Sequence, residues 1–140
     1  MPTIFTRIIN GELPGRFVWR DPQAVAFLTI NPITPGHTLV VPRAEVDHWL
    51  DLAPELAQHL MRVAQAVGQA QQRAFDPVKV GLMIAGLEVA HVHLHVLPIG
   101  TLGDLDFRKA DPNPRPGDLD RAAAGIRDAL RGLGYAEAAE

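Results

Sequence analysis

The chain has 140 residues, the usual length of a single domain, so a two-domain enzyme is not expected. Its composition, 47% apolar and 21% charged, excludes a disordered chain. A formal net charge of -3 argues against a nucleic-acid-binding protein, which usually carries a basic surface.

The sequence contains no cysteine and no serine. Disulfides, cysteine zinc sites and hydrolases with a serine nucleophile are therefore excluded. If the protein is an enzyme, histidine, carboxylate or threonine side chains must carry its chemistry. The N-terminal residues lack a signal-peptide pattern, and no stretch approaches the roughly 18 apolar residues of a membrane helix. We expect a soluble, cytoplasmic protein with no membrane partner.

The first third of the chain has the pattern of an antiparallel meander. Short β-rich runs at residues 17–19, 25–28 and 37–41 are separated by turn-forming residues at 21–22 and 31–36. Proline and glycine in these linkers fix the backbone where the chain must reverse. The pattern predicts three adjacent strands.

The rest of the chain alternates helical and strand-like patterns. Apolar residues spaced by three and four positions predict a long helix over 54–75. The elements expected after it are strands at 79–84 and 89–97, an irregular arm up to residue 117, a helix over 119–133 and a frayed end at 136–140. Residues 1–100 are expected to form the core, and 101–140 a C-terminal extension of the same domain.

Three histidines alternate with aliphatic residues at 91–95, in the order HVHLH. Alternate side chains of a strand share a face, so the imidazoles are expected on one side, with neighbours roughly 6.6 Å apart. An exposed polar face or buried structural histidines would be the ordinary explanation, but three such positions in a row favour a functional site. Two of the imidazoles can act as metal ligands, with His37, Glu88 or the third triad histidine completing the site, or one imidazole can act as a nucleophile that attacks phosphorus.

Residues 91–97 resemble the His-φ-His-φ-His-φ-φ signature of the histidine triad (HIT) superfamily, in particular its bacterial, Hint-like members. Residues 3–14 are similar to the family's opening segment and 26–42 to its second block, so the resemblance covers residues 3–98. It implies an α+β, HIT-like fold in which an antiparallel sheet carries the triad strand and a long helix packs on that sheet. It also implies a homodimer.

The resemblance implies a role for each histidine. His93 matches the nucleophile that attacks the α-phosphorus of a nucleotide and becomes nucleotidylated. His91 and His95 match flanking histidines that bind phosphate oxygens and hold the nucleophile's tautomer, and His37 matches a further active-site histidine. The residues at matching substrate-binding positions are Phe5, Ile8, Phe27 and Ile30 in an apolar base slot, with Thr29, Gly86 and Glu88 nearby.

Three departures from the family pattern lie at substrate-contact positions or near the N-terminus. Thr29 stands where many members have an aspartate that accepts the ribose hydroxyls. Leu87 stands where many have a glutamine, and Glu88 beside it is interpreted first as a solvent-facing turn residue. Some members bind structural zinc through N-terminal cysteines, which this chain lacks.

We therefore expect a nucleotide hydrolase or transferase with a covalent nucleotidyl-His93 intermediate. Its expected partner is a purine nucleotide or nucleotide conjugate, either a phosphoramidate or a dinucleoside polyphosphate, and neither a metal nor another cofactor is expected for the chemical step. Changes at Thr29, Val80 and Leu87 also allow a nucleotide-binding or adaptor protein with little activity. A metal hydrolase that uses His91, His93 and one outside ligand is the less favoured alternative.

The extension after Gly100 follows the triad directly, so it is a candidate specificity element. Arg108, Lys109 and Arg115 could reach a polyphosphate, but solvated loop charges are the commoner explanation. The sequence leaves the leaving group and the preferred base open.

Overall fold

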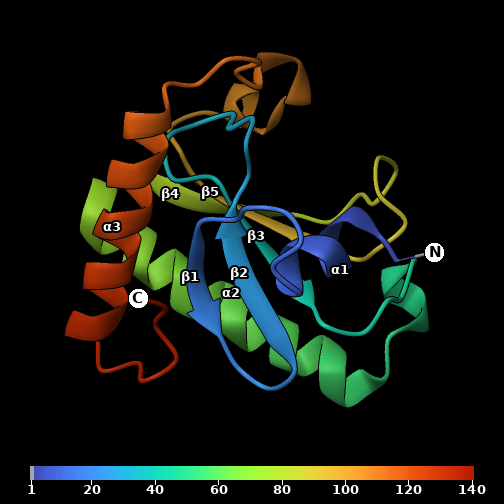
Figure 1. Ribbon diagram of the computed structural model, residues 1–140. Coiled ribbons are helices and arrows are strands. Elements are labelled where there is room, and N and C mark those ends of the chain that lie inside the picture. The colour runs from blue at the N-terminus through green and yellow to red at the C-terminus, as the bar shows by residue number, and fades with distance from the viewer. Residues whose placement is uncertain (1) are drawn as a thin grey trace.

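The computed structural model describes residues 2–140 (Figure 1). Five strands, β1 (Phe17–Arg20), β2 (Ala24–Leu28), β3 (Thr38–Pro42), β4 (Lys79–Met83) and β5 (Leu94–Ile99), form one sheet in the order β1-β2-β3-β5-β4. Every neighbouring pair is antiparallel. The helices are α1 (Ile4–Ile9), α2 (Pro54–Phe75) and α3 (Pro116–Gly132), with short 3-10 turns at Trp49–Asp51, Leu102–Leu105 and Phe107–Lys109. The expected α+β fold is confirmed.

The β1–β3 meander forms as predicted because its turns are fixed locally. Asp21 accepts hydrogen bonds from the backbone N–H groups of Gln23 and Ala24, at 2.7 and 2.8 Å, which closes the turn between β1 and β2. Gly36 adopts a φ of 90° before β3, and a Cβ there would lie 2.5 Å from the Phe75 ring. Only glycine fits this turn, which places His37 directly before β3.

The sheet separates two groups of apolar side chains. On one face α2 and α3 pack on the sheet, and Figure 1 shows α2 running behind it. The predicted helix over 54–75 is confirmed, and its Leu60 and Val67 are buried there beside Ile126 of α3. On the other face α1 packs against a smaller group that includes Phe5 and Phe27. The covered sheet is a rigid support for the residues that face α1.

The triad segment begins differently from the prediction. β5 starts at Leu94, so His91 and His93 lie before the strand rather than within it. The ladder with β3 ends at the Val40–Leu94 pair, although β3 continues to Pro42. The carbonyl oxygen of Pro42 instead accepts a hydrogen bond from the His91 imidazole, at 2.7 Å. A side chain thus replaces the next contact of the ladder.

The predicted alternation of the two faces is confirmed in spite of this break. The aliphatic side chains between the histidines pack in the core beside α2: Val92, Leu94 and Val96. The rings of His91 and His93 lie edge-on to Phe5, on the opposite face. The segment is held by a hydrogen bond of 2.7 Å from the Val92 N–H to the Val46 carbonyl.

Both ends of the chain contain structure that was not predicted. Helix α1 begins after Thr3, whose hydroxyl accepts a hydrogen bond from the Thr6 N–H and caps the helix. The prediction of a frayed C-terminus is wrong, because the Ala139 N–H donates to the Val18 carbonyl at 2.9 Å and Ala139 is buried. Helix α3 begins at Pro116, three residues before its predicted start.

The C-terminal extension packs on the first 100 residues. Helix α3 contacts α2 and β1, and its Leu119 and Leu130 belong to the same apolar core as α2. Within residues 2–140 no helix has the length and apolar composition needed to cross a membrane.

Candidate active site

His91 is the completely buried member of the triad. Its Nε2 lies 2.7 Å from the Pro42 carbonyl oxygen, which can only accept, so Nε2 carries the proton. Its Nδ1 lies 2.6 Å from the Thr3 hydroxyl, which donates to it. Thr3 is fixed in turn because its N–H donates to Glu45 at 2.7 Å. Both ring nitrogens of His91 are therefore occupied within the protein.

His93 is positioned by the backbone of His91. Its Nδ1 lies 2.8 Å from the His91 carbonyl oxygen, so Nδ1 carries the proton and Nε2 is left with a lone pair. The ring packs edge-on against Phe5, with 4.9 Å between ring centroids. Burial lowers the pKa of His93 below its ordinary value, although the nearby Glu88 carboxylate opposes this. The imidazole is therefore neutral and nucleophilic near pH 7.

His37 and His95 form a second hydrogen-bonded chain. The backbone N–H of Ile33 donates to His37 Nδ1 at 3.1 Å, so the proton of this neutral imidazole lies on Nε2. That Nε2 lies 2.9 Å from His95 Nδ1 and donates to it. His95 consequently carries its own proton on Nε2, the nitrogen left for a ligand.

The protonation states of this pair follow from burial. Burial, with the neighbouring His93 as a smaller cause, lowers the pKa of His37 to about 4. Burial, with His93 and His37 as smaller causes, lowers the pKa of His95 to about 3. Both rings are neutral at pH 7, and each acts as a hydrogen-bond donor rather than as a charge.

An apolar cavity of about 300 Å³ opens beside His93. All four residues of the predicted base slot line it: Phe5, Ile8, Phe27 and Ile30. Thr29, Glu88 and His95 lie along the same cavity. The structure therefore brings most of the predicted substrate-binding residues together beside His93.

A second cavity of about 440 Å³ adjoins the first at His95. The residues that line both are Thr29, Asn31, Glu88 and His95. The second cavity also contacts His37 and, from the arm after β5, Phe107, Ala110 and Pro112. His93 lines the first cavity and is not among the residues that line the second. His95 thus lies where two cavities with different lining residues meet.

Two predicted site residues, His91 and Gly86, do not line the triad cavities. Gly86 lines a separate hollow with Asp47 and His48, and the adjacent Leu87 is almost fully exposed. Glu88 is exposed, as predicted for a turn residue, and it also lines both triad cavities.

Sequence reasoning missed Thr3, Asn31 and Phe107. Thr3 carried a signal, since threonine is a preferred N-cap residue directly before a helix. Phe107 carried a weaker one, as the single aromatic residue between positions 100 and 117. No local sequence signal marked Asn31, because its side chain bonds to the carbonyl of Asp111, which is distant in the sequence.

The hydrogen bonds of the triad do not suit the predicted metal ligands. The metal-hydrolase alternative needs His91 and His93 as ligands, yet the ring nitrogens of His91 are both hydrogen-bonded inside the protein. Among residues 2–140, no group of three or more His, Cys, Asp and Glu side chains is arranged to hold an ion. Zinc bound through N-terminal cysteines has no ligands here, since Thr3 and Thr6 offer hydroxyl groups.

The depressed pKa values of His37 and His95 predict acid sensitivity of the fold. Above pH 6.5 these histidines are neutral in both folded and unfolded states, so they add no pH dependence. Below pH 6.5 the unfolded chain takes up protons that the folded protein accepts only near pH 4 and 3. The free energy of unfolding should fall by up to about 1.4 kcal/mol per pH unit for each histidine. Urea unfolding at pH 7, 6 and 5 measures this free energy of unfolding.

The matched variant is His37→Gln combined with His95→Gln, which should unfold with a smaller loss of stability between pH 6.5 and 5. His48→Gln, at an exposed ring outside the triad, should keep the wild-type dependence. Equal slopes for the wild type and the double variant would show that the pair is not held neutral by burial.

Comparison with known proteins places the chain in a family. The family model of the HIT domain matches residues 10–101. A HIT-like protein from Mycobacterium tuberculosis is 34% identical over 137 residues, which cover 93% of this chain and 94% of that protein. The purine nucleoside phosphoramidase of Escherichia coli is 32% identical over 109 residues, which cover 74% of this chain and 92% of that enzyme.

Solved structures share the fold. A histidine triad nucleotide-binding protein from Sulfolobus tokodaii matches with a TM-score of 0.82 at 26% identity, over 92% of each chain. A zinc-bound histidine triad family protein from Mycobacterium smegmatis matches with a TM-score of 0.79 at 28% identity, over 96% of each chain. The domain match and a relative that is 34% identical over 93% of the chain agree with the triad geometry. They show that the protein belongs to the HIT family.

Proposed function

We propose that the protein is a nucleotide hydrolase or transferase in which His93 attacks the α-phosphorus of a purine 5'-nucleotide conjugate. The observation that carries this proposal is the 2.8 Å hydrogen bond from His93 Nδ1 to the His91 carbonyl. It leaves the lone pair of Nε2 free beside an apolar cavity. Family membership and the phosphoramidase relative support a hydrolase or transferase that acts on nucleotides.

The proposed reaction has two steps. In the first, the lone pair of His93 Nε2 forms a bond to phosphorus while the bond from phosphorus to the leaving group breaks. The electron pair departs with the leaving oxygen or nitrogen, and a nitrogen also takes up a proton from solvent. In the second step water attacks phosphorus, the Nε2–P bond breaks and its electron pair returns to Nε2. Water releases one proton, and the nucleoside monophosphate departs; in a transferase another acceptor replaces water.

The other histidines divide the supporting roles. His95 offers its Nε2–H to the phosphate oxygens, where a fixed neutral donor stabilises the charge that develops in the transition state. His37 is a positioning residue, because it holds the tautomer of His95. His91 is also a positioning residue here: its carbonyl orients His93, while its ring nitrogens are engaged elsewhere. The proposal thus departs from the family-based expectation that His91 binds phosphate oxygens.

The apolar cavity is the proposed nucleoside site. Phe5 and Phe27 are buried and lie edge-on to each other at 5.7 Å, and together they provide an aromatic wall for a purine. Thr29 and Asn31 are two of the polar side chains that line both cavities, and a ribose would lie beside them. Thr29 supplies a hydroxyl group without the charge of the aspartate found in many members.

We also propose a homodimer that forms through β4. This strand is at the edge of the sheet, with Leu82 and Ile84 exposed at and after its end. Met61 of α2 is exposed beside it, and a hollow of about 650 Å³ between α2 and β4 includes Met61, Val80 and Leu82. An unpaired edge with adjacent apolar side chains is suited to pairing with a second copy of the chain.

The covalent step is tested by intact-protein mass spectrometry after rapid quenching, first with an adenosine 5'-phosphoramidate and then with a diadenosine polyphosphate. The wild type should gain the mass of one nucleoside monophosphate transiently. His93→Ala removes the only nitrogen placed for attack in this scheme, so it should form no adduct and lose turnover by roughly a thousandfold or more.

His48→Ala, which changes an exposed histidine outside the triad, is the control and should form the adduct normally. Wild-type turnover by His93→Ala on both substrates would refute the covalent mechanism. Nucleotide binding by the wild type without adduct or product would instead favour a binding or adaptor protein.

The dimer is tested by the molecular mass in solution. The wild type should sediment as a dimer, whereas Leu82→Asp combined with Met61→Asp should sediment as a monomer because charges would be buried at the interface. Leu102→Asp, at an exposed leucine of the arm, should remain dimeric. A monomeric wild type at micromolar concentration would contradict the proposal.

A further inference from the structure

The second cavity lies on the leaving-group side of the proposed reaction. His93 lines the proposed nucleoside site and not this cavity, while His95 and Glu88 line both. Displacement at phosphorus proceeds roughly in line, so the leaving group moves away from the attacking Nε2. The cavity that His93 does not line is therefore the space we assign to the leaving group of a phosphate held by His95.

The charge of this cavity is negative. Glu88 is the one ionised side chain that lines it, because His37 and His95 are neutral at pH 7. No lysine or arginine is among the lining residues in the described part of the chain. A polyphosphate leaving group would bring several negative charges next to an uncompensated carboxylate.

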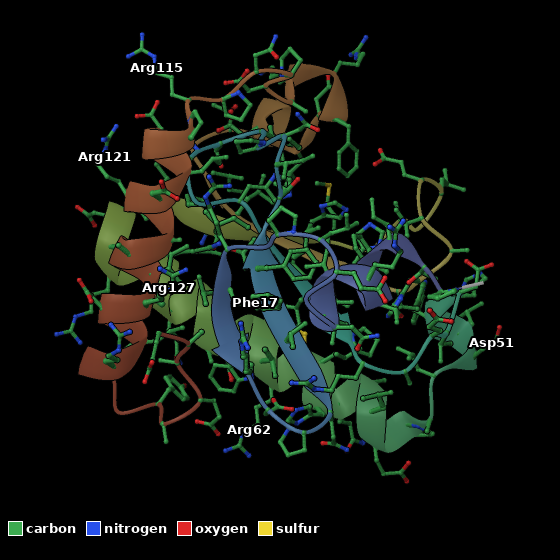
Figure 2. All side chains as sticks on the ribbon, in the orientation of Figure 1. Phe17, Asp51, Arg62, Arg115, Arg121 and Arg127 are labelled. Atoms are coloured by element: carbon green, nitrogen blue, oxygen red, sulfur yellow. The ribbon has the colours of Figure 1, made fainter. Side chains whose placement is uncertain are left out.

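The basic residues of the arm are directed elsewhere. Arg108 forms hydrogen bonds to both carboxylate oxygens of Asp106, at 2.8 to 3.1 Å. The Lys109 ammonium lies beside Gly103, where an added Cβ would be 2.9 Å from it. Arg115 projects outward from the start of α3 (Figure 2). The sequence-based possibility that these residues reach a polyphosphate in the same chain is therefore not supported by their positions.

The arm forms a fixed wall of the cavity. Asn31 Nδ2 donates to the Asp111 carbonyl, and the Asp111 N–H donates to the Pro32 carbonyl, both at 2.9 Å. The Phe107 ring packs edge-on against His95, with 4.9 Å between centroids. Phe107 lines the same cavity as Glu88, so it adds an aromatic surface near the carboxylate. A carboxylate and an aromatic ring together are suited to an organic cation.

We propose that Glu88 and Phe107 form a leaving-group subsite for an amine that carries a positive charge a few atoms beyond the scissile P–N bond. The preferred substrate class is then a nucleoside phosphoramidate of a diamine type, rather than a dinucleoside polyphosphate. This inference rests on the proposed function. In the first step the P–N electron pair departs with the amine nitrogen, which takes up one proton from solvent, while the distal ammonium stays unchanged beside Glu88.

The test compares three adenosine 5'-phosphoramidates that differ in the charge of the leaving group: diaminopropane (positive), butylamine (neutral) and β-alanine (negative). For the wild type, kcat/KM should be roughly tenfold higher for the positive group than for the neutral one, and lowest for the negative group. In Glu88→Gln, the ratio of kcat/KM for the positive substrate to that for the neutral one should be close to one. In Glu88→Lys, kcat/KM should be higher for the negative substrate than for the positive one. Ratios are compared because any effect of Glu88 on His93 is common to all three substrates.

Glu137→Gln, at an exposed carboxylate near the C-terminus, is the matched control and should keep the wild-type ratio. Turnover of all three substrates with equal kcat/KM would overturn the leaving-group inference and leave the proposed function standing. Turnover of none, with no adduct on His93, would overturn both.

Discussion

A buried imidazole needs a partner for each ring nitrogen that has no access to water, and this constraint organises the whole site. The His91 carbonyl takes the Nδ1 proton of His93, which leaves a lone pair on Nε2. That carbonyl is available because residues 91–93 are not part of the sheet ladder, which ends at Leu94. The break in β5 is therefore what gives the buried His93 ring a defined tautomer.

The rest of the fold holds this short segment in place. Val92 and Leu94 anchor it in the core beneath α2, and Thr3 at the start of α1 binds the His91 ring from the other side. Since α1 also contributes Phe5 to the apolar cavity, one helix both fixes the triad and forms part of the proposed nucleoside site. The arm after β5 closes the opposite side through Phe107. In our proposals, α1 therefore contributes to recognition of the base and the arm to recognition of the leaving group.

Periodicity predicted the elements whose pattern is set by the core. The helix over 54–75 and the three strands of the meander follow from apolar spacing and turn residues, and the two faces of 91–95 follow from simple alternation. The start of β5 could not be predicted, because it depends on which group bonds to the Pro42 carbonyl. The same holds for contacts between distant segments, such as Asn31 with the arm and the chain end with β1. Glu88 is exposed as expected, but its place along both cavities follows from the fold and not from its local sequence.

The central claim is the distribution of imidazole protons, and nitrogen NMR of protein labelled with 15N histidine tests it most directly. At pH 7, proton–nitrogen correlation spectra distinguish Nδ1–H from Nε2–H and both from the charged ring. We predict neutral rings for His37, His93 and His95, with the proton of His93 on Nδ1 and those of His37 and His95 on Nε2. A His93 ring protonated on Nε2, or charged at pH 7, would contradict it.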